Sequence, residues 1–271
     1  MRPKSTPRTL LAFALVLSTP ALPSLSGGAC GRESLDEQAA SEAVDSTELT
    51  SHEAAMLVGG VEDDSATLTA ADLAAAARTR GAARFQPAGC ATVTVDGMTV
   101  TYVLAGCTGR FGLAHVTGTL VFTLSDAADG IHIVGTGQGL QVNRATLDLN
   151  ATAVLTDDAG KRKLVVTTHG SGTGGRGNSF TRDGSYTALR DPATQCIALD
   201  GQWQLQVGNA SRTTTVTGIE RCDGMCLAAG GLIQHTGFRG RTITLTLDGT
   251  AVAQWQSSSG KSGTIDLACG G

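Results

Sequence analysis

Cysteine is the residue type whose number and positions most directly suggest chemistry in this chain. A thiol can form a disulfide, bind a metal ion or carry a lipid. Seven are present: Cys30, Cys90, Cys107, Cys196, Cys222, Cys226 and Cys269. An odd number leaves at least one thiol without a disulfide partner within the chain, and setting aside Cys30, the first in the sequence, leaves six that can form three disulfides.

These six cysteines are expected to be structural. We favour Cys90 with Cys107, which are nearest neighbours, and also Cys196 with Cys222 and Cys226 with Cys269. Cys222 and Cys226 could instead face each other across a hairpin, and other connectivities remain open. The motif CDGMC has three residues between its thiols, and no second cysteine pair with matching spacing follows it. The spacing therefore predicts disulfides rather than a metal site.

The first of these pairs sets a requirement on the chain between its two thiols. With Asp96-Gly97 as a hairpin turn, Cys90 faces Val103, and Cys107 lies four residues further on. A direct bridge between Cys90 and Cys107 therefore predicts that the chain folds back at Ala105-Gly106, because four residues of ideal strand span roughly 13 Å.

Candidates for a catalytic or ligand site are few. Histidines are scattered along the sequence, and no Gly-x-Ser-x-Gly or His-Glu-x-x-His motif occurs. The stretch GKS at Gly260 resembles the end of a phosphate-binding loop, but the first glycine of that motif would be at position 255, which is Trp255. We therefore expect no cofactor, no metal and no catalytic residue. The two exceptions to consider as ligand-binding residues are His169, in the glycine-rich stretch HGSGTGGRGNS that is typical of a loop, and Trp255, whose side of its strand the alternation leaves open.

The first 29 residues have the pattern of an export signal. Arg2, Lys4 and Arg8 precede an apolar run over residues 10–17, and small residues lead to Cys30. The stretch SGGAC resembles the bacterial lipoprotein signal, departing from it at Gly27, where leucine is usual. The resemblance implies a lipid on Cys30 that holds the protein at a membrane, in the outer membrane, the periplasm or on the cell surface. The alternative is a secreted protein with a spare thiol.

Charge divides the mature chain into two parts. Residues 30–80 carry 11 acidic and three basic side chains, a net charge of −8, whereas residues 81–271 carry 13 and 14, a net charge of +1. We expect residues 30–85 to be an acidic tether that is disordered or partly helical, with one short helix near residues 69–80, where Thr69 and Asp72 can cap it. Neither part has the basic surface that nucleic-acid binding requires.

The remainder, residues 86–271, reads as an all-β domain stabilised by disulfides. Apolar residues alternate with Thr and other polar residues, as in TITLTLDG, and this alternation indicates strands with one buried and one solvent-exposed face. Six Asp-Gly pairs suggest hairpin turns. The pattern predicts an antiparallel meander or sandwich of about 12 strands, with a possible subdivision near residue 191.

These features favour an exported, lipid-anchored β-domain that acts as a non-enzymatic interaction or envelope-structural module. Its partner would be a protein or a polysaccharide that the sequence does not identify. The alternative is an enzyme or a small-ligand or carbohydrate binder of unrecognised family, with a loop site near His169 or Trp255.

Overall fold

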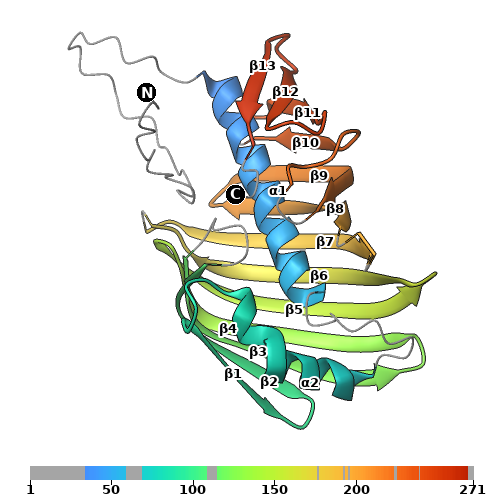
Figure 1. Ribbon diagram of the computed structural model, residues 1–271. Coiled ribbons are helices and arrows are strands. Elements are labelled where there is room, and N and C mark those ends of the chain that lie inside the picture. Colours follow the sequence, from blue (N-terminus) through green and yellow to red (C-terminus); the bar gives the residue numbers. More distant parts are fainter. Residues whose placement is uncertain are drawn as a thin grey trace, which may run out of the picture.

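The computed structural model describes residues 34–58, 69–108, 115–175, 177–191, 193–194, 196–222, 225–237 and 239–267. Thirteen antiparallel strands form one sheet, and their order in the sheet is their order in the chain (Figure 1). The strands are β1 (Ala91–Asp96), β2 (Thr99–Thr108), β3 (His115–Ala127), β4 (Gly130–Val142), β5 (Ala145–Asp158), β6 (Lys161–Thr173), β7 (Ser179–Asp191), β8 (Cys196–Val207), β9 (Ala210–Arg221), β10 (Leu232–Thr236), β11 (Thr242–Thr246), β12 (Val252–Ser257) and β13 (Ser262–Asp266).

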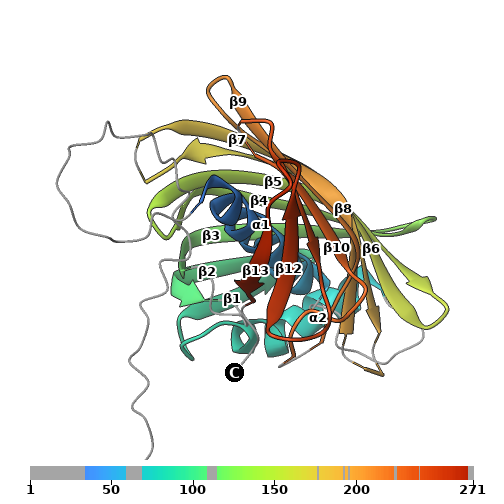
Figure 2. The same cartoon turned by 90° about the horizontal axis from the view of Figure 1, so that it is seen from above.

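The sheet curves around two helices that lie on the same side of it (Figure 2). Helix α1 (Leu35–Val58) crosses the strands from β13 towards β6, and α2 (Ala70–Arg80), followed by the short 3-10 helix η2 (Gly81–Arg84), covers β1 to β3. We call the helix-covered side the inner face and the opposite side the outer face. Neither helix in the described part of the chain is both long enough and apolar enough to cross a membrane.

The expected all-β antiparallel fold is confirmed, with 13 strands where about 12 were expected. On β5 the side chains of Ala151, Ala153 and Leu155 are buried on the inner face, as the alternation predicts. β7 and β8 pair along their whole length, from Phe180 opposite Val207 to Asp191 opposite Cys196. The described strands on either side of residue 191 therefore belong to one continuous sheet.

Two of the Asp-Gly pairs are not turns. Gly184 and Gly201 lie within β7 and β8, directly opposite Trp203 and Tyr186. A Cβ atom on Gly201 would approach the Tyr186 Cβ to 2.4 Å, and one on Gly184 would lie 3.2 Å from the Trp203 Cβ. These glycines are present because large aromatic side chains occupy the adjoining space on the inner face, so packing rather than chain reversal explains them.

The short helix expected near residues 69–80 is α2. Thr69 is its N-cap, accepting a hydrogen bond from the Asp72 backbone N–H, while the Asp72 carboxylate accepts one from the Thr69 N–H. The Thr69 hydroxyl also donates to the Asp72 carboxylate at 2.7 Å, and this bond, together with the one from the Thr69 N–H, holds the pKa of Asp72 below its usual value. The capping box begins the helix where the sequence predicts it.

Candidate functional site

The structure joins two of the three expected cysteine pairs. Cys90 is bonded to Cys107, and Cys196 to Cys222. Cys226 is also disulfide-bonded, and its expected partner Cys269 lies outside the described residues, as does Cys30. The expected fold-back at Ala105-Gly106 is absent, because β2 runs unbroken from Thr99 to Thr108. Cys90 lies beside Ala105, whose N–H donates to the Cys90 carbonyl, rather than opposite Val103. With a bulge between Leu104 and Cys107, the Cα atoms of the two cysteines are 5.3 Å apart.

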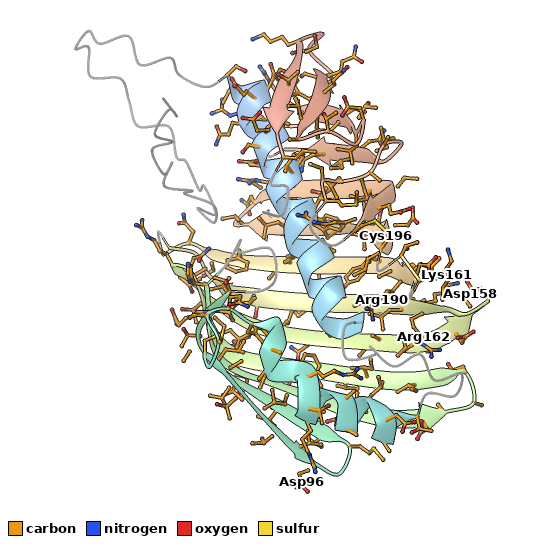
Figure 3. All side chains as sticks on the ribbon, viewed as in Figure 1. Asp96, Asp158, Lys161, Arg162, Arg190 and Cys196 are labelled. Atoms are coloured by element: carbon orange, nitrogen blue, oxygen red, sulfur yellow. A yellow bond between two sulfur atoms is a disulfide. The ribbon has the colours of Figure 1, made fainter. Side chains whose placement is uncertain are left out.

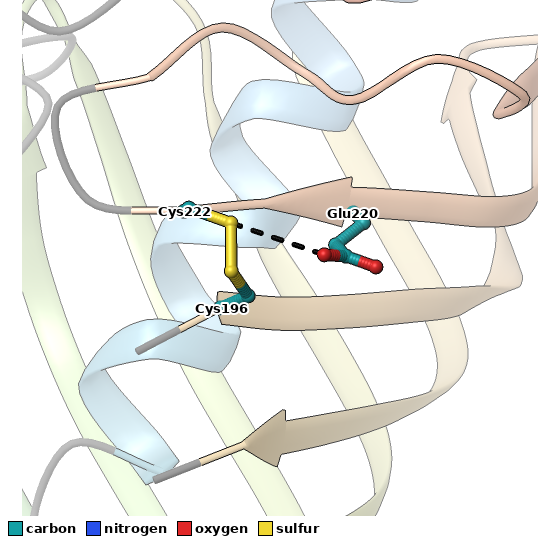
Figure 4. Close-up of side chains that lie close together, drawn as sticks. All are labelled: Cys196, Glu220 and Cys222. Atoms are coloured by element: carbon teal, nitrogen blue, oxygen red, sulfur yellow. Dashed lines mark hydrogen bonds between the residues drawn. A yellow bond between two sulfur atoms is a disulfide. The ribbon is translucent and has the colours of Figure 1, made fainter. Parts of the chain in front are cut away.

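The second disulfide lies within a cluster of potential metal ligands. The one group of three metal-ligand side chains found there is Cys196, Glu220 and Cys222, whose ligand atoms lie within 4.8 Å of one another (Figure 4). The two sulfur atoms are bonded to each other, and a Glu220 carboxylate oxygen lies 3.8 Å from the Cys222 Sγ. A metal would require the thiolates that this bond removes, so the group is a structural link between β8 and β9.

The two residues proposed for a ligand site lie on opposite faces of the sheet. His169 is not in a loop: β6 continues to Thr173, and the His169 Nδ1 lies 2.6 Å from the Asp183 carboxylate across the strand pair on the outer face. Trp255 is 7% exposed, and its ring covers Gly263 on the inner face. The structure therefore does not bring His169 and Trp255 together.

The outer face carries neutral polar side chains in register from strand to strand. Directly opposed residues form one row across β3 to β12, which we call the hydroxyl–amide row: Thr123, Val134, Thr152, Thr167, Ser185, Gln202, Thr215, Gln234, Thr244 and Gln256. All are exposed or half-exposed, and all but Val134 bear a hydroxyl or an amide. The row offers many hydrogen-bond donors and acceptors and no charge.

On the inner face, α1 is attached to the sheet by polar contacts along one stripe of the helix. Asp36, fully buried, accepts hydrogen bonds from the Arg241 guanidinium at 2.7 Å and the Ser257 hydroxyl at 2.9 Å. The Arg241 hydrogen bond is the main cause that holds the pKa of Asp36 below its usual value. Because burial alone would raise that pKa, the bonds made by Asp36 outweigh its desolvation.

Further along α1, each helical turn meets the next strands of the sheet. The Glu42 carboxylate lies 2.9 Å from the Arg212 guanidinium of β9 and 3.8 Å from the buried His235 Nε2 of β10. Burial lowers the pKa of Arg212, and the Glu42 charge opposes this. Thr50 then accepts a hydrogen bond from Arg182 of β7 at 2.8 Å, and Ser46 accepts one from the indole N–H of Trp203.

The short basic run Lys161-Arg162-Lys163 begins β6, and its middle residue is buried. Arg162 is 6% exposed on the inner face of β6, in phase with Leu164, and donates a hydrogen bond to Asp157 at 2.7 Å. Arg190 of β7 lies directly opposite Arg162 and is equally buried (Figure 3). Alternation with Leu164 is the sequence signal that could have identified Arg162 as buried.

Comparisons with protein-family models, with curated proteins and with solved structures give no match to this chain. The sequence pointed to single residues, His169 and Trp255, but did not reveal the hydroxyl–amide row or the contacts of α1. The signal for α1 was its spacing, since Asp36, Ala39, Ala43 and Thr50 recur at helical intervals on one face.

Proposed function

We propose that this protein is an exported, lipid-anchored and non-enzymatic module that binds its partner through the outer face of its sheet. The observation that carries the proposal is the hydroxyl–amide row, which extends in register over ten strands and remains exposed. A neutral surface rich in donors and acceptors suits a neutral, hydroxyl- or amide-rich partner in the cell envelope. It does not suit an anionic polymer such as nucleic acid, whose binding depends on positive charge.

The arrangement of the inner face supports the same proposal. Its apolar side chains form a packed core beneath the helices, with Leu164, Val166 and Ile243 fully buried. The histidines of the described chain lie on separate elements, and the His169–Asp183 pair is on an open face, where water would surround it. Hydrolytic chemistry requires a nucleophile, a base and an orienting group that converge.

A co-sedimentation experiment with isolated bacterial envelopes tests the outer face. Thr167 lies near the middle of the hydroxyl–amide row, so Thr167→Arg is expected to weaken binding at least tenfold. Ala75→Arg, on the exposed side of α2, is the matched control and should bind like the natural protein. Protease treatment of the envelopes before the assay distinguishes a polysaccharide partner, which survives it, from a protein. Equal binding by Thr167→Arg and the natural protein, or no binding at all, would contradict the proposal.

The lipid anchor is tested separately by intact mass of the native exported protein, with and without reductant. We expect a chain that begins at Cys30 and carries acyl groups, and that gains one hydrogen for each of six thiols on reduction. An unmodified thiol at Cys30 would contradict the anchor while leaving the binding face intact.

A further inference from the structure

The open sheet has two edge strands, β1 and β13. In the described part of the chain β13 pairs only with β12, and β1 pairs only with β2 along its length. The outer side of an edge strand bears N–H and C=O groups that can pair with another strand, so natural proteins usually cover or protect such edges.

The β1 edge has a cover. Helix α2 packs beside it, and the Arg78 side chain donates a hydrogen bond of 3.0 Å to the Val95 carbonyl of β1. A residue from outside the sheet thus occupies an edge acceptor at this end. The other end, beside the first turns of α1 in Figure 1, differs.

The register of the β12–β13 hairpin determines which backbone groups of β13 point away from the sheet. The Ser257 N–H donates to the Lys261 carbonyl at 2.7 Å, and the Leu267 N–H donates to the Ala251 carbonyl at 2.8 Å. Antiparallel pairs alternate between bonded and non-bonded positions. Counting from either bond, Ser262, Thr264 and Asp266 are non-bonded positions with β12. We call these three residues the edge triplet.

The edge triplet directs its N–H and C=O groups outward, and its exposed side chains do little to protect the edge. It contains no proline and no lysine, and the pairing of β12 with β13 has no register shift. Pro, Lys and bulges are the usual devices that prevent strand addition. Asp266 supplies one charge, at the end of the strand.

We propose that β13 pairs antiparallel with β13 of a second copy of this chain, forming a two-fold dimer with one continuous sheet. The two-fold axis would pass between the two Thr264 residues, and each Ser262 would face Asp266 of the other copy. The triplet is complementary to itself in this register, because the carboxylate meets a hydroxyl and not a second carboxylate. The three paired positions would provide six backbone hydrogen bonds across the axis.

The inner face is also compatible with this pairing. Ile265 and Gly263 are the inward positions of β13, and both are half-exposed. In the dimer each Ile265 would lie beside Gly263 of the other copy, where the Trp255 ring already provides an apolar surface. The dimer would therefore bury exposed apolar area of Ile265 without placing two large side chains against each other.

Sedimentation equilibrium of the mature chain over a wide concentration range tests the proposal. A five-residue strand contact is smaller than a standard interface, so we expect a dissociation constant on the order of 0.1 mM. Thr264→Pro removes an N–H that β12 does not use and should weaken the dimer by about tenfold or more while preserving the hairpin. Thr264→Lys places two ammonium groups across the axis and should have the same effect.

The matched control is Thr246→Lys, which adds the same charge to the outer face of β11, an internal strand. It should dimerise like the natural protein, and circular dichroism should show the same strand content in all variants. A natural protein that stays monomeric throughout the range, as it would if another segment of its own chain covered the edge, overturns the proposal. So does dimerisation of the folded Thr264 variants at the natural affinity.

Discussion

Replacing Glu42 with Gln is expected to loosen α1 from the sheet by about 3 kcal/mol. The Glu42 carboxylate lies 2.9 Å from the Arg212 guanidinium, and the two side chains are only 18% and 10% exposed. Removing one member of a buried ion pair costs roughly 3–5 kcal/mol, because the other charge stays desolvated. The residual exposure of Glu42 places the expected loss at the lower end of that range.

The loss expected for Glu42→Gln is large compared with the free energy that α1 gains by burying its apolar side chains against the sheet. Among the described side chains of α1, the buried apolar ones are Ala39, Ala40, Ala43 and Val44. They bury six methyl or methine carbons, which at about 0.8 kcal/mol each give about 5 kcal/mol. Losing about 3 kcal/mol from the polar contacts should therefore make local opening of α1 common while the sheet stays folded.

Hydrogen exchange followed by mass spectrometry measures this opening directly. Peptides from the first half of α1 should exchange about 100-fold faster in Glu42→Gln, since each 1.4 kcal/mol is a factor of ten. Glu37→Gln is the matched control, because Glu37 is exposed on the same helix and loses the same charge. Combining Glu42→Gln with Arg212→Met should restore much of the protection. Equal exchange in the Glu42 and Glu37 variants would refute the assignment of Glu42 as an anchor.

Three further outcomes are expected. Arg241 lowers the pKa of Asp36, so the stability that Asp36 contributes is present above its ordinary pKa of about 4 and is lost as the pH falls through the lowered value. Asp36→Asn should therefore flatten the acid limb of a pH–stability curve, and an unchanged limb would contradict this. Joint replacement of Cys90 and Cys107 by Ala, which opens a loop with a sequence separation of 17, should lower the free energy of unfolding in urea by about 3 kcal/mol. Leu164→Ala, at a fully buried position in β6, should cost about 3 kcal/mol in the same assay, and a loss below about 1 kcal/mol would contradict its place in the core.

The strands were predictable because alternation is a local property. Leu245 and Leu247 face inward and Thr244 faces outward, as the sequence alone indicates. The two short-range cysteine pairs were also predictable, since hairpins bring nearby thiols together. By contrast, the Asp-Gly pairs at Gly184 and Gly201 predict turns, but both glycines lie within strands. They are needed there because aromatic side chains of the neighbouring strand fill the space that a Cβ atom would occupy.

The position of α1 could not be predicted from the sequence for a different reason. A helix that will pack on a sheet usually shows a stripe of large apolar side chains. The inner stripe of α1 instead bears Ala39, Ala43 and Thr47 with the acidic Asp36, so the segment resembles a solvated tether. We expected an acidic tether at residues 30–85 that is disordered or partly helical; residues 35–58 are helical, and this helix packs against the sheet. Small side chains allow that close approach, and the residues that bond Asp36 lie about 200 positions away.

The charge division seen in the sequence acquires a physical meaning from this packing. The β-region is nearly neutral overall, but Arg182, Arg212 and Arg241 all direct their guanidinium groups towards α1. Their partners on the helix include Asp36 and Glu42, so part of the acidic excess before residue 81 is the internal counter-charge of the inner face. Because these counter-charges lie on α1, the arginines need no carboxylates on the outer face, and the hydroxyl–amide row is uncharged. Any recognition by that face must then depend on hydrogen bonds and shape, and should vary little with salt.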